Sequence, residues 1–269
     1  MHRSGAPFKT PTLHQLLTHT SGLSYAFNDG VLRRAMVKNN ISFNNGTWPL
    51  AEAGDCAAAL PLAFEPGKRW EYSVATDVLG RVVELVSGKS LDVVFQDKIF
   101  GPLAMAETGF SVTVLLLARL ATPYAAHEDL QSVRTAAPKG GARLHYMEGP
   151  SDTYFRNPVT LSGGGGLTGS LDDYMCFCEM LRLGGIASAG RVLLPQSTTF
   201  MLRNHLPGDI ASMAPYSFSE QSAWVSGLGL PARSCWIQRS LARQGTLVIL
   251  AGAARPQRCF GSITSLISA

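Results

Sequence analysis

Two short groups of residues have the types and spacing that could carry chemistry. The first is Tyr72 followed by Ser73, directly before a helical pattern, and the second is His19 with Ser21 two residues later. A hydroxyl is a poor nucleophile until a neighbouring base takes its proton, so a His beside a Ser is a candidate pair. Because His19 and Ser21 fall within one turn, local hydrogen bonds that shape this turn are the favoured interpretation. Taken alone, Tyr72 is a half-buried aromatic residue in front of a helix.

Other polar residues give weaker signals. Four glycines, 163–166, follow Ser162 without the Gly-Lys-Ser/Thr of a phosphate loop, so a backbone role near a cleft or a flexible turn is favoured. Asp172 and Asp173 fit the first turn of a helix, where the helix dipole favours acids, better than a catalytic pair. We predict no metal site and no cofactor, because three further histidines lack metal-ligand spacing: His127, His145 and His205.

The excess of basic over acidic residues comes from the last segment of the chain. Pro231–Ala269 contains five Arg and no Asp, Glu or Lys, so residues 1–230 carry 18 basic residues (23 minus 5) against 19 acidic ones. The net charge of +4 therefore gives no ground for a nucleic-acid or membrane partner. With 46% hydrophobic residues the chain can bury a core. No apolar run approaches the roughly 20 residues of a membrane helix.

The elements that would position these residues are mostly helical. The clearest helix has an apolar stripe from Val78 to Val86 and a glycine, Gly88, at its C-cap. Residues from about 28 to 46 are rich in Asn and Gly and are predicted as loop. Strand patterns are few, which leaves room for a small sheet near either end of the chain. Apolar periodicity, caps and breakers predict six helices: Thr12–Thr20, Glu52–Leu60, Thr76–Ser87, Leu91–Ile99, Ser170–Leu183 and Pro195–Arg203.

Four segments stand in an order that resembles a known family. Together they are similar to the β-lactamase-related serine hydrolases, which include class C β-lactamases, D,D-peptidases and esterases of the EstB type. The resemblance covers roughly residues 10–230, and four segments in order are far more specific than any one of them. The segments are Leu16–Leu23, Pro66–Ser73, Gly101–Phe110, and Ser162–Leu167 followed by Asp172-Asp173-Tyr174.

The resemblance implies a role for Tyr72. In the family a Ser-x-x-Lys box supplies the nucleophile, a Tyr in a second box assists as general base, and a third box on an edge strand helps to bind the substrate. Tyr72 matches the second box and would be its remnant general base. Val74, at the third position of that box, brings no amide, which favours the esterase-like branch. Full-length relatives would hydrolyse small-molecule esters or β-lactams through an acyl-enzyme with an oxyanion hole.

The nucleophile Ser and Lys of the first box are absent from this sequence. None of the six Lys has a Ser three residues before it, and no Gly-x-Ser-x-Gly elbow offers another nucleophile. We therefore expect that Met1 falls after the nucleophile segment of the family and that the chain is catalytically incomplete. The alternative is a non-enzymatic binding or scaffold protein that uses the helical subdomain. The residues three before each Lys are Ala6, Ala35, Glu65, Val86, Phe95 and Ala136.

The expected fold is α+β, of the β-lactamase/D,D-peptidase type, with a helical region and a depleted antiparallel sheet. Residues 1–230 would form a partial β-lactamase-related domain and 231–269 an atypical basic tail. Residues 1–7 contain no apolar stretch of a signal peptide, so a cytoplasmic location is expected. We expect neither nucleic-acid nor membrane partners, and the sequence does not indicate an oligomeric state.

The composition of the tail suggests that it is read out of frame. When possible codons for Val248–Ile263 are read from their third base, they can encode Asp-Phe-Gly-Trp-Gly-Gly and further residues similar to the C-terminal region of the family. The Trp-Gly-Gly would be the third box. Two bases of each hidden codon are fixed by the visible residue, which limits chance agreement. We therefore predict a frame change near Gly229–Arg233.

Sequencing the coding locus tests these two expectations together. A Ser-x-x-Lys segment should be encoded in some frame upstream of the Met1 codon, and the Asp-Phe-Gly-Trp-Gly-Gly string should be readable in a shifted frame after about residue 229. An ordinary promoter and ribosome-binding site directly before Met1, with neither frame present, would contradict the interpretation.

Overall fold

The computed structural model describes residues 9–26, 31–43, 46–125, 145–146 and 148–207 of the chain. Within these ranges most regular structure is helical, as the sequence predicts, and strands are short. The basic tail, His127 and both ends of the chain, where the small sheet was expected, lie outside the described residues. The out-of-frame origin of residues 231–269 therefore stays a prediction.

The first four helices contain one that the sequence pattern missed. They are α1 (Leu13–Leu17), α2 (Val31–Lys38), α3 (Leu50–Ala58) and α4 (Ala75–Ser87). Thr12 caps α1 in a reciprocal capping box with Gln15, which satisfies two backbone N–H groups that the helix leaves free. The helix α2 lies in the stretch that was predicted as loop, so that prediction was wrong there. The Asn and Gly residues on both sides of α2 concealed its short amphipathic pattern.

The helix α4 packs against three other helices, α1, α3 and α5. Gly88 ends it in the left-handed region at φ 67°, as its position predicts. The predicted apolar stripe is wrong at its C-terminal end. Leu79 is buried, but Leu85 and Val86 are 63% and 84% exposed. Residues 85–90, which are the end of α4 and the turn after it, lie outside the core, so periodicity alone overstated the buried length of the helix.

The later helices follow their predicted starts closely. Helix α5 (Leu91–Phe95) runs directly into a π-helical turn at Gln96–Phe100, and together they cover the predicted Leu91–Ile99 helix. Ser170 caps α6 (Leu171–Arg182) by accepting from the backbone N–H of Asp173 at 3.3 Å. Pro195 opens α7 (Pro195–Met201), a position where its missing N–H is harmless. Among the described residues, 3₁₀ turns lie at Leu117–Arg119 and Tyr154–Arg156.

The described strands form two short antiparallel pairs in the middle of the chain. β1 (Tyr124–Ala125) pairs with β2 (His145–Tyr146), and β3 (Ile186–Ala187) pairs with β4 (Gly190–Arg191). Each strand has two residues, so each antiparallel pair is only two residues long. Among the described residues the antiparallel sheet is therefore small, in line with the prediction of a depleted one.

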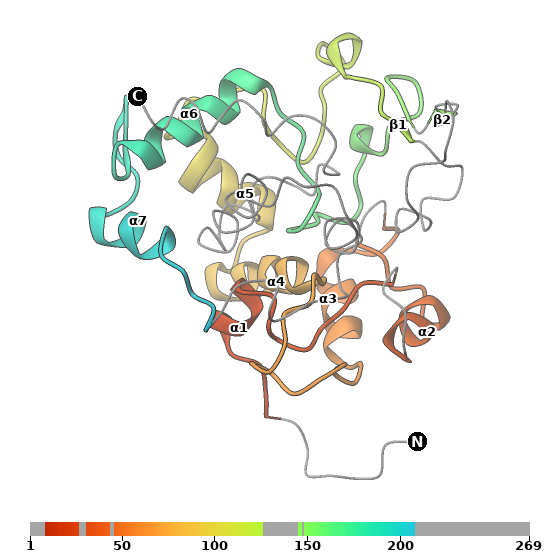
Figure 1. Ribbon diagram of the computed structural model, residues 1–269. Helices are drawn as coiled ribbons and strands as arrows, with labels where there is room; N and C mark the ends of the chain where they lie inside the picture. The colour runs from red at the N-terminus through yellow and green to blue at the C-terminus, as the bar shows by residue number, and fades with distance from the viewer. Residues whose placement is uncertain (1–8, 27–30, 44–45, 126–144, 147, 208–269) are drawn as a thin grey trace, which may run out of the picture.

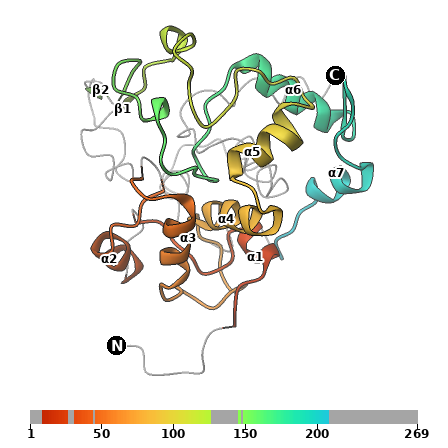
Figure 2. The same cartoon turned by 180° about the vertical axis from the view of Figure 1, so that it is seen from behind.

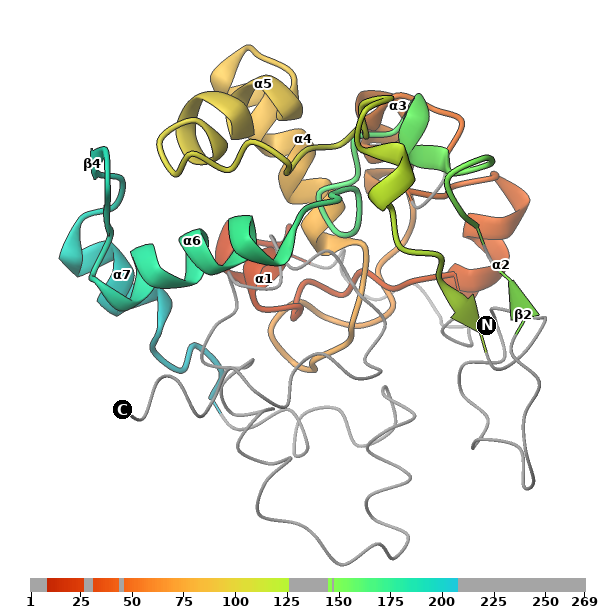
Figure 3. The same cartoon turned by 90° about the horizontal axis from the view of Figure 1, so that it is seen from above.

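The helices separate into two groups that meet at α4. Figures 1 and 2 show α1, α2, α3 and α4 in one half of the molecule and α5, α6 and the β1–β2 pair in the other. Seen from above, α6, α7 and β4 lie at one side and α2 with β2 at the opposite side (Figure 3). One cluster of buried apolar side chains joins both groups, with members from α3, α4, α5 and α6.

The glycine turn at 162–166 lies directly on the first half of α4. A Cβ on Gly163 would come within 2.5 Å of the backbone oxygen of Thr76 and 3.3 Å of the Gly80 Cα. A Cβ on Gly164 would lie 2.7 Å from the Thr76 hydroxyl. These residues are glycines because the turn approaches the helix backbone more closely than any side chain permits. The sequence had left a flexible turn and a backbone role near a cleft both open, and the close contact favours the backbone role.

We predict that Gly163→Ala destabilises the protein by about 1–3 kcal/mol, the usual effect of overpacking. The methyl group would meet a backbone carbonyl, which cannot rotate away. Gly109→Ala is the matched control, since its Cβ would find ordinary contacts at 3.7 Å or more. Urea unfolding followed by fluorescence measures both variants. Equal stability of the two would show that the turn does not lie against α4.

Candidate active site

The four segments that carry the resemblance converge in space. The backbone N–H of Glu71 donates to the carbonyl of His19 at 2.9 Å, and that of Gly67 donates to Thr20 at 2.7 Å, so the first two segments run side by side. The last two meet in a two-bond bridge between Gly109 and Thr168, at 3.0 and 2.9 Å. Segments that are neighbours in this order, the first with the second and the third with the fourth, are therefore also in contact in the structure.

Tyr72 lies where the first two segments meet, at the entry to α4. Its ring is half-buried between the rings of Tyr25 and His19, with centroids 5.0 and 5.1 Å away. A side-chain cluster fixes the segment in front of it: Ser24 donates to the buried carboxylate of Glu71, and Arg69 binds the other oxygen of that carboxylate at 2.5 Å. Charge-assisted hydrogen bonds of this kind restrict both position and direction.

The hydroxyl groups of Tyr72 and Tyr25 share a hydrogen bond, which lowers the pKa of Tyr72 and raises that of Tyr25. Thr76, in the first turn of α4, is in turn hydrogen-bonded to Tyr25 and lowers the pKa of Tyr25. Three hydroxyl groups thus form a chain that runs from α4 to Tyr72.

Burial keeps Tyr72 protonated at neutral pH. Desolvation is the main cause that raises the pKa of Tyr72 to about 12, and the negative charge of Asp77 adds to it. A general base works best with a pKa near the working pH. In this environment Tyr72 is therefore a protonated, hydrogen-bonding phenol at neutral pH.

His19 and Ser21, for which local hydrogen bonds in the turn were predicted, bond to different partners in the structure. Ser21 does make the predicted local bond, by accepting from the Leu23 N–H at 3.3 Å. His19 instead places Nδ1 3.2 Å from the hydroxyl of Ser73, 54 residues away, so the local interpretation is wrong for this residue. The ring is fully buried, which lowers the pKa of His19 to about 4 and keeps it neutral. Ser73 is also fully buried, which prevents its hydroxyl from reaching a substrate.

The sequence analysis missed Asp77, the most deeply buried charged group beside Tyr72. One oxygen of its carboxyl accepts from the Ser162 hydroxyl at 2.5 Å and from the Gly164 N–H at 3.1 Å. The other oxygen has no hydrogen-bond partner. Desolvation outweighs these bonds and raises the pKa of Asp77 to about 6. The only sequence signal was an acid in the first turn of a helix, which the helix dipole explains equally well.

The remaining candidates have structural environments. Asp173 accepts from the Glu107 N–H and the Thr108 hydroxyl, both at 2.8 Å, and so joins α6 to the third segment. Asp172 is exposed at the start of α6, and His205 packs on Phe200. Within the described ranges, no cluster of three or more His, Cys, Asp or Glu could bind a metal ion. Nor does any described helix have the length and apolarity to cross a membrane.

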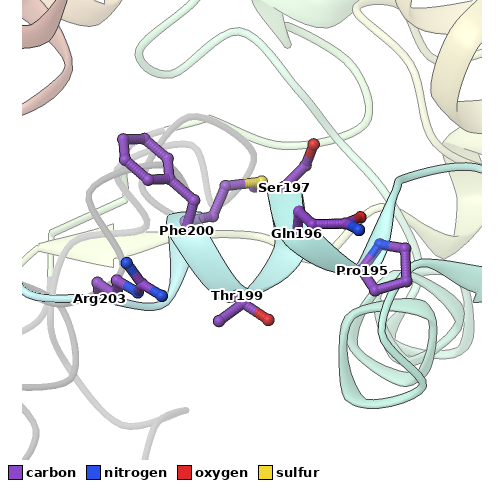
Figure 4. A pocket seen from close by; sticks show the side chains of 7 residues that line it. Pro195, Gln196, Ser197, Thr199, Phe200 and Arg203 are labelled. Carbon is purple, nitrogen blue, oxygen red and sulfur yellow. The ribbon is translucent and has the colours of Figure 1, made fainter.

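A hollow of about 640 Å³ lies along α7, away from Tyr72. Pro195, Phe200 and Arg203 line it with four neighbours from the same helix. In Figure 4 the side chains of Phe200 and Thr199 point away from each other, so they do not converge on a ligand. The chemistry-bearing residues and this hollow are separate features.

Comparison with known proteins identifies the family. The beta-lactamase family matches residues 3–246, which is most of the chain. The chain belongs to the beta-lactamase family. The matched range runs past residue 230, and the domain division at that residue stays a prediction.

Individual members of the beta-lactamase family align with most of this chain at about one third sequence identity. Protein Rv1367c of Mycobacterium tuberculosis is 34% identical over 81% of the chain and 50% of its own length. Esterase EstB of Burkholderia gladioli is 35% identical over 64% of the chain and 44% of its own length. Among solved structures, EstCE1, described as a hydrolase with promiscuous acyltransferase activity, is 29% identical with a TM-score of 0.56 over 72% of the chain and 51% of its own. The chain thus spans about half the length of the relatives it matches.

The two buried ionisable groups of the site should oppose each other as pH changes. The unfolded chain binds a proton on His19 near pH 6.5 and the folded chain only near pH 4, so this group makes the free energy of unfolding fall as pH falls through that range. Asp77 has a folded pKa of about 6 against 3.8 unfolded, so it makes the free energy of unfolding rise as pH falls from 6 to 3.8.

Single substitutions should therefore reveal slopes of opposite sign relative to the unsubstituted chain. Asp77→Asn should lose stability between pH 6 and 4, and His19→Asn should gain it, each by at most about 1.4 kcal/mol per pH unit. Asn suits position 19, where φ is 54°. Urea unfolding at several pH values measures the differences. Slopes of the same sign in both variants would contradict the assigned shifts.

Proposed function

We propose that this chain carries the general-base part of a serine hydrolase site that acts on small-molecule esters, and that the chain alone does not turn them over. The observation that carries the proposal is that the first two segments meet at Tyr72 and that the fourth segment packs on the helix that Tyr72 precedes. The family supports a serine hydrolase, and the chain's similarity to the esterase EstB and to the hydrolase and acyltransferase EstCE1 supports ester hydrolysis or acyl transfer.

The environment of Tyr72 supports the esterase-like branch. Val74, the third residue of the box, is buried in the apolar core and begins α4 as its N-cap residue. It therefore offers no polar group to a substrate. The Tyr72 hydroxyl is the polar group of the box that remains, and Tyr25 and Thr76 orient it.

Two observations support the lack of turnover by the chain alone. The sequence contains no Ser-x-x-Lys, so no serine has the lysine partner that the family uses. Burial raises the pKa of Tyr72 to about 12, so at neutral pH its hydroxyl would accept a proton poorly. In a site whose parts act as a unit, the base contributes little without the nucleophile.

We expect purified protein to hydrolyse nitrocefin and p-nitrophenyl esters no faster than buffer, with Tyr72→Phe giving the same rate. The reason is that the phenol has no nucleophile to activate. A fluorophosphonate probe followed by mass spectrometry checks for an activated serine. Burst kinetics together with labelling of any Ser would overturn the proposed inactivity.

The positive part of the proposal is tested by exchange of the box. EstB, with its own tyrosine box replaced by residues 66–88 of this chain, should retain hydrolysis of p-nitrophenyl esters. The same chimera with Tyr72→Phe should lose at least tenfold in kcat, since general-base catalysis typically contributes about 10²–10⁴-fold. A chimera that folds and is equally active with Phe at this position would refute the role of Tyr72.

A further inference from the structure

A buried carboxyl connects the glycine turn to the tyrosine of the site. Asp77 is fully buried in the first turn of α4, and one of its oxygens accepts hydrogen bonds from Ser162 and Gly164. A Cβ on Gly164 would stand 2.9 Å from the other oxygen, so the turn lies against the whole carboxyl. A fully buried acid is costly to the fold even when its carboxyl accepts hydrogen bonds. Its presence therefore calls for a role besides packing.

The neighbours of Asp77 lead to Tyr72. Thr76, the preceding residue in α4, is hydrogen-bonded to Tyr25, and Tyr25 is hydrogen-bonded to the hydroxyl of Tyr72, whose ring lies 5.0 Å from that of Tyr25. The negative charge of Asp77 also acts on both phenols directly. The first turn of α4 therefore has two contacts: Asp77 binds the glycine segment 162–166, and Thr76 leads through Tyr25 to the Tyr72 hydroxyl.

We propose that Asp77 is a positioning residue, which fixes the glycine turn on α4 and thereby sets the orientation and electrostatic environment of the Tyr72 hydroxyl. This inference rests on the proposed function of Tyr72 as general base. The carboxylate disfavours a negative charge on Tyr72, and the hydrogen bonds from Thr76 through Tyr25 hold the Tyr72 hydroxyl in place. Asp77 touches no reacting atom and acts only through Tyr72.

The other charged groups nearby are engaged elsewhere. Arg81, one turn further along α4, pairs with Glu84 at 3.4 Å and with Asp55 of α3 at 3.8 Å. His19, from the segment after α1, contacts the Tyr72 ring and is neutral above about pH 4. We therefore expect the change in charge of Asp77 around pH 6 to alter the electrostatic environment of Tyr72.

Carbon-13 NMR of the whole chain, labelled at Tyr Cζ and Asp Cγ, tests the proposal without turnover. Tyr→Phe variants assign the resonances. The Tyr72 Cζ resonance should shift with a midpoint around pH 6, at the midpoint of Asp77 itself, and separately from any His19 step near pH 4. Asp77→Asn should abolish the pH 6 step.

Asp173→Asn is the matched control, because Asp173 is also a buried first-turn acid with side-chain and backbone partners but lies away from Tyr72. It should leave the Tyr72 step unchanged. Should Asp77→Asn fail to fold, Ser162→Ala serves instead: loss of the donor to the carboxylate should move the Tyr72 step to higher pH.

A Tyr72 resonance that stays flat while Asp77 titrates, or a step that survives Asp77→Asn, would overturn the positioning role. The same holds if Ser162→Ala leaves the midpoint in place. Failure of the proposed function has a different signature. An EstB chimera whose activity ignores Tyr72 would refute the general-base role, while the NMR coupling between Asp77 and Tyr72 would still be present.

Discussion

The buried carboxyl of Asp77 is the constraint on which the rest of the site depends. A carboxyl removed from water must find hydrogen-bond donors inside the protein, and here the donors are Ser162 and Gly164. To bring them close, the turn must approach α4 to a distance that only glycine allows, which accounts for Gly163 and Gly164. A single polar requirement thus connects two segments 85 residues apart.

The same contact connects the pieces of the family resemblance. The first two segments meet around Tyr72, the last two meet at Gly109 and Thr168, and Asp77 joins the two pairs through α4. The chain belongs to the beta-lactamase family, and its contacts place a tyrosine at the entry to a helix. Our proposal of an inactive chain follows from the missing Ser-x-x-Lys and from the burial that raises the pKa of Tyr72.

The sequence could predict features whose cause is local. Thr12, Ser170, Pro195 and Gly88 mark helix ends through interactions within a few residues, and the structure confirms each position. The partner of His19 and the importance of Asp77 depend on residues 54 and 85 positions away, which no pattern within a window of sequence contains. Burial was predicted least well. Leu85 and Val86 continue an apolar stripe that the neighbouring elements do not cover. The role of Tyr72 remains a proposal.

A double-mutant cycle on Asp77→Asn and Ser162→Ala tests the central contact most directly. If the hydroxyl of Ser162 donates to a buried carboxyl, the two substitutions should be non-additive, with a coupling free energy of about 1–3 kcal/mol in urea unfolding. The account predicts that Ser162→Ala destabilises the original chain far more than it destabilises the Asp77→Asn variant. Additive effects would contradict it, because they would mean that α4 and the glycine turn are not joined through this carboxyl.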